Sequence, residues 1–292
     1  MATSLYAISV ANWEDADKAL SDGLSLSEHV RDKRSWGEFA FARAVVLCHR
    51  AEFAHLAPWS ARMRHAADRA DDVQRSAHAL MTDVWLCLRQ GRFADALERL
   101  NEAIDLLAGR HAEADEIHAY GILALARLRC GDRTGARSAG ATALGLISRS
   151  QPTTMYTIEG YACLAEMYLS LWAGGDVVAA RSARKACAAL TQLARVFPIA
   201  RPRALLCAGM AAERSGNRRR AATAWRRSLA NAERLAMPYE SARIHRSIGH
   251  SIAMDDPARD EHLSRACAIF AEIGATYELA TTRESMSAFH PG

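Results

Sequence analysis

The sequence predicts an all-α protein: a right-handed α-solenoid in which about seven helix pairs stack in order and a last helix covers the open end. Three observations lead to this prediction. Apolar residues recur at helical spacing, the turn between two helices recurs about every forty residues, and the prolines of the second half fall between the expected helices. We therefore expect one continuous body over residues 1–292 and no β-strands.

The helix pair is clearest in the stretch Trp85–Ile104. Apolar residues spaced four apart precede Gly91, and a new apolar stripe at helical period starts at Phe93. Glycine can end a helix in the left-handed conformation at little cost, so the chain can reverse at this point. Ala96 and Ala103 are small enough for the two helices to approach closely. This stretch therefore predicts a helical hairpin.

The hairpin recurs along the chain. Its turn falls at Ala11, Ala51, Gly91 and Gly131, and later turns near 174–175, 216 and 255–256 continue the period with shifts of a few residues. A fixed period of this length is typical of a solenoid of helix pairs. We expect pairs at about 2–31, 34–70, 72–109, 112–149, 153–195, 201–236 and 238–273, followed by a capping helix at 275–288.

The N-terminal end of the predicted array has no polar capping helix, because the sequence enters the first pair almost at once. Solenoid ends normally need a cap. We therefore expect the array to pack on something at this end, and self-association through the first pair is one such contact. Descent from the end of a longer protein is the alternative.

Composition predicts a cytoplasmic protein. Half of the residues are hydrophobic and 24% are charged, which is enough apolar material for a core. The seven cysteines are scattered without a C-x-x-C pair, as expected of reduced thiols in helix cores. We expect no secretion signal, since the first residues carry no basic leader before an apolar run. We also expect no membrane span, because no apolar segment is long enough.

The first helix of each pair is expected to line an inner groove. Counting from each turn gives side chains that mix aromatic, methionine, histidine and arginine residues, a mixture typical of peptide-binding surfaces. The alternative is that the large aromatic side chains pack between neighbouring pairs. The expected groove residues are Phe41, His49, His78, Met81, Trp85, Arg89, His118, Leu125, Arg129, Tyr161, Tyr168, Trp172, Arg203, Met210 and Arg214.

Basic residues are concentrated in one part of the chain. Between Arg181 and Arg246 there are fifteen arginines and lysines against three glutamates. In the helix expected at 218–236, the apolar stripe includes Trp225, and the opposite face carries Arg219, Arg220, Arg226, Arg227 and Arg234. This basic face is either a solvated surface or a patch for an acidic protein, nucleic acid or anionic lipid. Nucleic-acid binding is the weaker reading, because Trp225 is committed to the core.

Motifs for catalysis are missing from the sequence. It contains no G-x-x-x-x-G-K-[ST] phosphate loop, no H-E-x-x-H and no G-x-S-x-G. His111, Asp115 and His118 have a spacing that could hold a metal, but polar residues are common at a helix start, so we expect no metal there.

Glu159 and Glu166 form the strongest enzyme alternative, because a carboxylate pair near Tyr161 and Tyr168 could serve acid–base chemistry in a pocket at about 156–172. Their spacing of seven residues is wide even for an inverting glycosidase. We expect instead that tyrosine or arginine neighbours bind these carboxylates. The sequence therefore predicts neither an enzyme nor a cofactor.

The hairpin resembles the tetratricopeptide repeat, with small residues at close-packing positions, a glycine at the turn and then F-x-x-A-x-x-x-L. The segments 151–172, 194–206, 232–249 and 262–283 are similar to a particular helical region. It is the C-terminal region of bacterial proteins that join a class III adenylate/guanylate cyclase domain to an AAA/STAND-type ATPase. Maltose-regulator-like transcription factors carry a similar region.

The resemblance implies a sensor or interaction module whose cyclase and nucleotide sites lie outside such a region, so it assigns no catalytic residue here. The Lys and Asn of the repeat's carboxylate clamp are replaced at groove positions such as His78 and Trp85. We therefore expect a non-catalytic protein- or peptide-binding scaffold or regulatory module, in bacterial signalling with a cyclase- or ATPase-type partner. The alternative is binding of nucleic acid or an acidic partner through the basic residues of 181–246.

Overall fold

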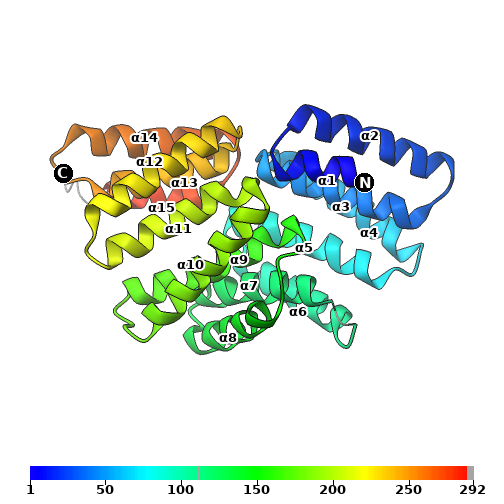
Figure 1. The fold of residues 1–292 in the computed structure, drawn as a ribbon, viewed down its shortest axis with the longest axis horizontal. Coiled ribbons are helices and arrows are strands. Elements are labelled where there is room, and N and C mark those ends of the chain that lie inside the picture. The colour runs from blue at the N-terminus through cyan, green and yellow to red at the C-terminus, as the bar shows by residue number, and fades with distance from the viewer. Residues whose placement is uncertain (111, 288–292) are drawn as a thin grey trace.

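The computed structural model describes residues 1–110 and 112–287, and these residues form an all-helical fold without strands (Figure 1). Consecutive helices pack in pairs, as the period predicts. The first helices of the pairs are α1 (Ala2–Ser9), α3 (Lys33–His49), α5 (Val73–Gln90), α7 (Glu113–Arg129), α9 (Ile158–Ala173), α11 (Arg201–Arg214) and α13 (Pro238–Ser251). The second helices are α2 (Trp13–His29), α4 (Phe53–Asp68), α6 (Phe93–Leu107), α8 (Arg133–Arg149), α10 (Ala179–Val196), α12 (Arg218–Arg234) and α14 (Pro257–Glu272); α15 (Thr276–Ser287) follows.

Helix ends follow local sequence signals. Six helices start at an Asn or Asp whose side chain accepts a hydrogen bond from a backbone N–H of the first turn, which satisfies a donor with no partner inside the helix. These capping residues are Asn12, Asp32, Asp72, Asp132, Asn217 and Asp256. Pro202, Pro238 and Pro257 do not lie between helices as expected, but in the first turns of α11, α13 and α14. Proline fits there because those positions need no N–H donor.

The four predicted turns at Ala11, Ala51, Gly91 and Gly131 are confirmed in their backbone geometry. Gly91 and Gly131 have positive φ angles of 73° and 85°. Ala11 and Ala51 adopt the same left-handed conformation, each with φ of 57°, although their Cβ atoms make it less favourable. The chain therefore turns at the position that the period predicts even where no glycine is present.

Close helix packing shapes the middle of the fold. A Cβ atom added to Gly121 on α7 would lie 2.2 Å from the carbonyl oxygen of Gly160 on α9, so the two backbones touch. Both helices are buried along most of their length. The second helices α8 and α10 bury one face and leave the other to solvent, as amphipathic outer helices do.

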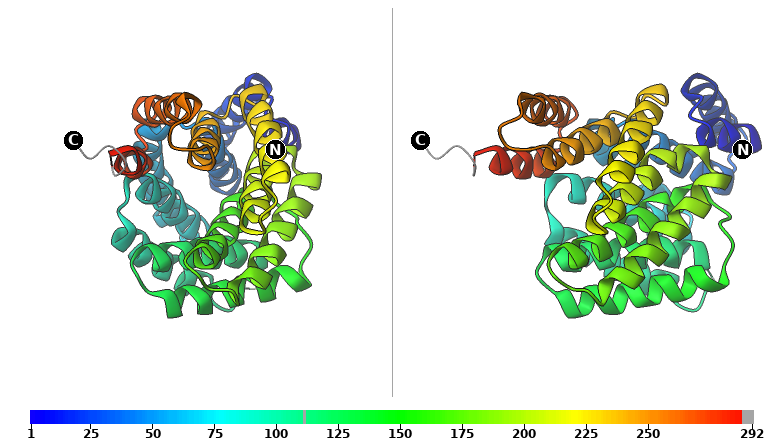
Figure 2. Two further views of the ribbon diagram at one scale, coloured as in Figure 1. Left: turned by 90° about the vertical axis from the view of Figure 1, so that its left-hand side faces the viewer. Right: turned by 60° about the vertical axis from the view of Figure 1, so that its left-hand side comes forward.

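The array curls back on itself, so that helices late in the chain contact helices near its start (Figures 1 and 2). The Phe53 and Tyr239 rings have centroids 5.8 Å apart, and those of Phe93 and Tyr277 are 4.8 Å apart. The expected capping helix thus packs on α14 and also reaches α5; residue 288 of its expected range lies outside the described residues. Because of this closure, the inner faces of the first helices pack against one another.

Other sequence expectations can be placed on this fold. Five of the seven cysteines are buried, and all seven are free thiols. Within residues 1–110 and 112–287, no helix combines the length and apolar character that a membrane crossing requires.

Candidate functional site

The expected groove residues are mostly interior residues. Eleven of the fifteen side chains are buried and contact other parts of the protein, and Leu125 is one of them. Trp172 and Met210 are half-buried, while Arg129 and Arg214 are exposed. The expectation of an open groove lined by all of these side chains is therefore wrong for this structure, because other helices cover eleven of them. The other ten buried side chains are Phe41, His49, His78, Met81, Trp85, Arg89, His118, Tyr161, Tyr168 and Arg203.

A buried ionic network occupies the centre of the fold. Arg89 on α5 donates to Glu159 on α9 at 2.8 Å, and Arg203 on α11 lies 3.0 Å from the other oxygen of the same carboxylate. Arg203 also donates to Glu240 on α13 at 2.6 Å. Burial raises the pKa of Glu159, but Arg203 and Arg89 outweigh it and hold that pKa well below its usual range. The network joins four first helices through charges that are compensated inside the protein.

A second ionic cluster lies beside the first. Glu166 on α9 is ion-paired with Arg243 on α13, and its other oxygen accepts a hydrogen bond from Arg129 on α7 at 2.7 Å. Burial alone would raise the pKa of Glu166, yet Arg243 and Arg129 lower it to about 2. Arg129 also donates to the hydroxyl of Tyr277 on α15 at 2.9 Å. This cluster connects the middle of the array to its last helix.

These contacts bear on the enzyme alternative at 156–172. Both carboxylates, Glu159 and Glu166, are bound by arginines, as the sequence led us to expect. The cavity that they share has a volume of about 20 Å³, which is room for about one water molecule and not for a substrate. A general acid at neutral pH needs a raised pKa, and both groups have lowered ones. The geometry therefore does not favour acid–base catalysis by this pair.

The histidines near α7 form a packed polar cluster. His78 Nε2 and Asp115 are 2.9 Å apart, and Gln74 donates to the same carboxylate at 2.9 Å. Trp85 donates to Nε2 of His118 at 3.1 Å, which fixes that nitrogen as an acceptor. His111 lies outside the described residues. No group of three or more metal-ligating side chains is assembled in the described part of the chain.

The basic face is where the sequence places it. All five arginines expected there are exposed on α12, and none makes an ion pair within residues 1–110 and 112–287. The outer helix α10, which like α12 packs against α11, carries four exposed cationic side chains and no acidic residue. They are Arg181, Arg184, Lys185 and Arg195. Glu233 is the one carboxylate in α12. The outer surface of these two helices is therefore strongly cationic.

The aromatic side chains near this cationic surface are either buried or stacked against an arginine. Trp225 on α12 is buried and donates to the carbonyl oxygen of Leu206, and the guanidinium of Arg184 lies 5.0 Å from the centre of the Trp172 ring. Exposed apolar side chains there are aliphatic, with Val178 and Val196 at the two ends of α10. The surface thus offers cations and small apolar groups but no free aromatic ring.

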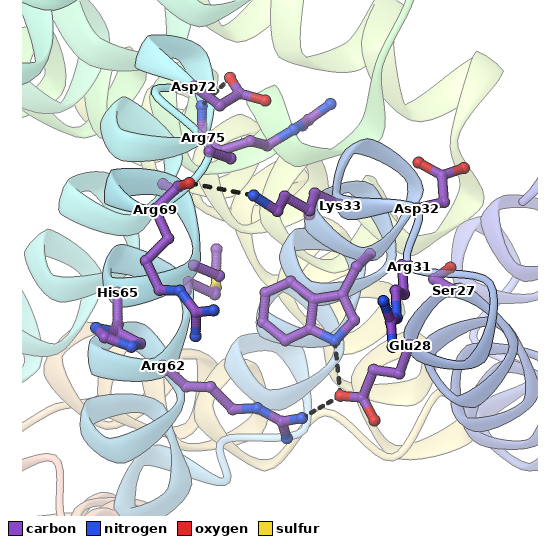
Figure 3. A pocket seen from close by; sticks show the side chains of 16 residues that line it. Ser27, Glu28, Arg31, Asp32, Lys33, Arg62, His65, Arg69, Asp72 and Arg75 are labelled. Atoms are coloured by element: carbon purple, nitrogen blue, oxygen red, sulfur yellow. Dashed lines mark hydrogen bonds and ion pairs between the residues drawn. The ribbon is translucent and has the colours of Figure 1, made fainter.

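A hollow between the first two helix pairs was not anticipated from the sequence (Figure 3). It has a volume of about 290 Å³ and lies between the end of α2, the start of α3, the end of α4 and the start of α5. Arg62 and Arg69 reach toward it from one side, and Arg31 and Lys33 from the other. A comparison of the basic residues at successive turns, one period apart, could have indicated this cluster.

No family model matches this chain, and no curated protein matches it either. The fold defines an all-helical protein of consecutive helix pairs with a cationic outer surface. The resemblance to the helical region of cyclase–ATPase proteins stays a prediction.

Proposed function

We propose that the chain is a non-catalytic binding module that recognises an acidic segment of a partner protein through the basic face of α12 and the cationic outer surface of α10. The observation that carries the proposal is the set of five exposed α12 arginines without an ion-pair partner in the described residues. Crowded like charges on a helix are unfavourable to one another, and an acidic partner relieves this.

The spacing of the arginines suits an extended acidic segment. Arg220, Arg227 and Arg234 are seven residues apart, so they form a stripe with a rise of about 10.5 Å between successive members. An extended peptide advances by about 3.3 Å per residue, so about every third residue of the peptide meets an arginine. Guanidinium groups bind carboxylates in a bidentate way.

A protein partner is favoured over nucleic acid by the side chains around the arginines. Binding of single strands combines cations with exposed aromatic rings on which bases stack. Here Trp225 is buried and Arg184 covers Trp172, while Val178 and Val196 are exposed. A polypeptide segment that mixes acidic and aliphatic residues matches this surface. The kind of partner, a cyclase- or ATPase-type signalling protein, comes from the sequence resemblance alone.

Fluorescence anisotropy tests the proposal with three labelled probes: a peptide of glutamate and leucine residues, single-stranded DNA and double-stranded DNA. We expect the peptide to bind most tightly at near-physiological salt, with an affinity that weakens as salt screens the charges. The variant R219E/R220E/R226E/R227E should bind the peptide at least about tenfold more weakly.

The matched control carries the same change in net charge at exposed cations elsewhere: Lys18, Arg110, Arg133 and Arg283 replaced by glutamate. It should keep at least half of the wild-type affinity, because the effect depends on the position of the charges. If both variants lost the same affinity for the peptide, binding would depend on net charge alone, and this would contradict the proposal. If either DNA probe bound more tightly than the peptide, the basic face would be a nucleic-acid-binding surface, and the proposal would be wrong.

A further inference from the structure

We propose that the hollow between the first two helix pairs is a binding site for a small organic anion, a flat body of one or two rings that carries a carboxylate or phosphate group. The site is independent of the proposed protein-binding surface, since the hollow is formed by α2–α5 and that surface by α10 and α12. Its volume of about 290 Å³ is at the lower end of the range for small-molecule sites.

The walls of the hollow can hold an apolar ring. Its apolar lining comes from Trp36 on α3 and from Met63, Ala66, Ala67 and Ala70 on α4 and the turn after it. A hollow lined by an indole and by aliphatic side chains favours a flat apolar ligand, which buries its surface against them. This part of the site supplies contact area and not charge.

Trp36 is held in place before any ligand arrives. Its Nε1 donates to Glu28 Oε1 at 2.9 Å, and Arg62 donates to the same oxygen. The Arg62 guanidinium lies 5.2 Å from the ring centres of both Trp36 and Trp59. Because hydrogen bonding and cation–π contact already fix the indole, the side chain loses little conformational freedom when a ligand packs against it.

The charges around the hollow leave an excess of two positive charges. Five cationic side chains face three carboxylates. Each carboxylate already has a partner: Arg62 binds Glu28, while Asp32 and Asp72 accept backbone hydrogen bonds at the starts of α3 and α5. The pKa of Asp32 is lowered by its hydrogen bonds from Ser35, so that carboxylate stays ionised as a cap. The cations are Arg31, Lys33, Arg62, Arg69 and Arg75.

Two of the five cations are available to a ligand. Arg75 pairs with Glu38, and Lys33 donates to the carbonyl oxygen of Arg69 at 3.2 Å. Arg31 and Arg69 are exposed and make no ion pair within the described residues. Their guanidinium groups lie at the rim of an apolar hollow (Figure 3), where a bound anion would be partly shielded from water. This position for two free arginines favours a carboxylate or phosphate on an otherwise apolar ligand.

The backbone of Arg31 provides a clean test. Its φ is 57°, a left-handed conformation that glycine adopts more easily. The variant Arg31→Gly therefore removes a guanidinium group and relieves backbone strain at once. Ala236 has a φ of 50° at a turn far from the hollow, so Ala236→Gly is the backbone-matched control.

The probe is anilinonaphthalene sulfonate, a fluorescent aromatic anion that suits both parts of the site. We expect saturable binding of one dye per chain. Indoleacetate or adenosine monophosphate should displace it, and whichever does so at lower concentration identifies the preferred anionic group. Indole alone and inorganic phosphate alone should each displace it at least about tenfold less effectively, because each satisfies only half of the site.

Variants of the full chain locate the dye. Arg31→Gly and Arg69→Gln should each weaken dye binding at least about fivefold, while Arg31→Gly keeps or raises thermal stability. Ala66→Trp, which fills the hollow without changing charge, should abolish dye binding with the helical circular dichroism unchanged. Ala236→Gly should bind like the wild type. Wild-type affinity in the double variant R31G/R69Q, or displacement by indole as effective as by indoleacetate, would overturn the proposal.

Discussion

Trp13 in the first helix pair donates a hydrogen bond from Nε1 to the carbonyl oxygen of Leu235, which follows α12, at 2.8 Å. The two residues are 222 positions apart in sequence. This bond joins the beginning of the array to its later part, so the inner faces of the first helices are enclosed. Closure explains why arginines and histidines expected in a groove lie in the interior.

The first prediction concerns this closing contact. Trp13→Phe removes the hydrogen bond and keeps most of the ring, so we expect a loss of about 1 kcal/mol in the free energy of unfolding. Hydrogen exchange should accelerate at the start of α2 and the end of α12, since that is where the contact lies. Urea unfolding and amide exchange measured by mass spectrometry provide the two readouts.

The control for Trp13→Phe is Trp59→Phe. Trp59 donates to the carbonyl oxygen of Ala40 at the same distance of 2.8 Å, but within one helix pair. Trp59→Phe should lower the free energy of unfolding by a similar amount. Amide exchange at the start of α2 and the end of α12 should remain as slow as in the wild type. If both variants leave exchange at those segments unchanged, the Trp13 contact does not contribute to closure.

The second prediction concerns the ionic centre. Glu159→Gln removes the carboxylate that Arg89 and Arg203 share, and leaves their charges buried without full compensation. We expect a loss of about 3–5 kcal/mol in the free energy of unfolding, as for other broken buried pairs. Glu28→Gln, which breaks an exposed ion pair with Arg62, should cost no more than about 1 kcal/mol. Urea unfolding of both variants checks the contrast, and equal costs would contradict it.

The third prediction concerns two buried histidines. Burial lowers the pKa of His49 and His118 to about 4, whereas both are near 6.5 in the unfolded chain. Between those values the unfolded chain binds protons that the folded protein excludes. The stability that these two neutral histidines contribute should therefore be complete above about pH 6.5, and the free energy of unfolding should fall as the pH drops toward 4. Urea titrations across this window measure the slope.

His118→Gln tests whether His118 contributes to that slope. Glutamine can still accept the hydrogen bond from Trp85 but takes up no proton, so the fall between about pH 6.5 and 4 should become shallower. The same change at the exposed His29, His29→Gln, is the control for the substitution itself. An unchanged slope in His118→Gln would show that His118 is protonated in the folded state as readily as in the unfolded chain.

The fourth prediction concerns two glycines in helices. Gly121→Ala places a Cβ atom 2.2 Å from the Gly160 carbonyl oxygen, so α7 and α9 must separate. We expect a loss of at least about 2 kcal/mol in stability from this overpacking. Gly145 on α8 has no atom within 4 Å of the added Cβ, so Gly145→Ala should raise stability by up to about 1 kcal/mol through helix propensity alone. Thermal unfolding decides whether the two changes have opposite signs.

Local features of the fold could be predicted from sequence. Helical spacing of apolar residues indicated the helix pairs, and the turns at Gly91 and Gly131 adopt the expected left-handed backbone. The exposed face of α12 followed from the stripe that includes Trp225, because solvent exposure within one helix depends on a period that the sequence carries. These features depend on interactions between residues that are close in the chain.

The interior site required the tertiary structure. Arg89 and Glu159 are seventy residues apart, and Arg203 reaches the same carboxylate from a third helix. The path of the array depends on small rotations between successive pairs, and these add up over the chain. The sequence shows the period but not the rotation at each step. It therefore determined which faces of each helix are apolar, while the tertiary structure decided that the inner faces meet and that their charges neutralise one another.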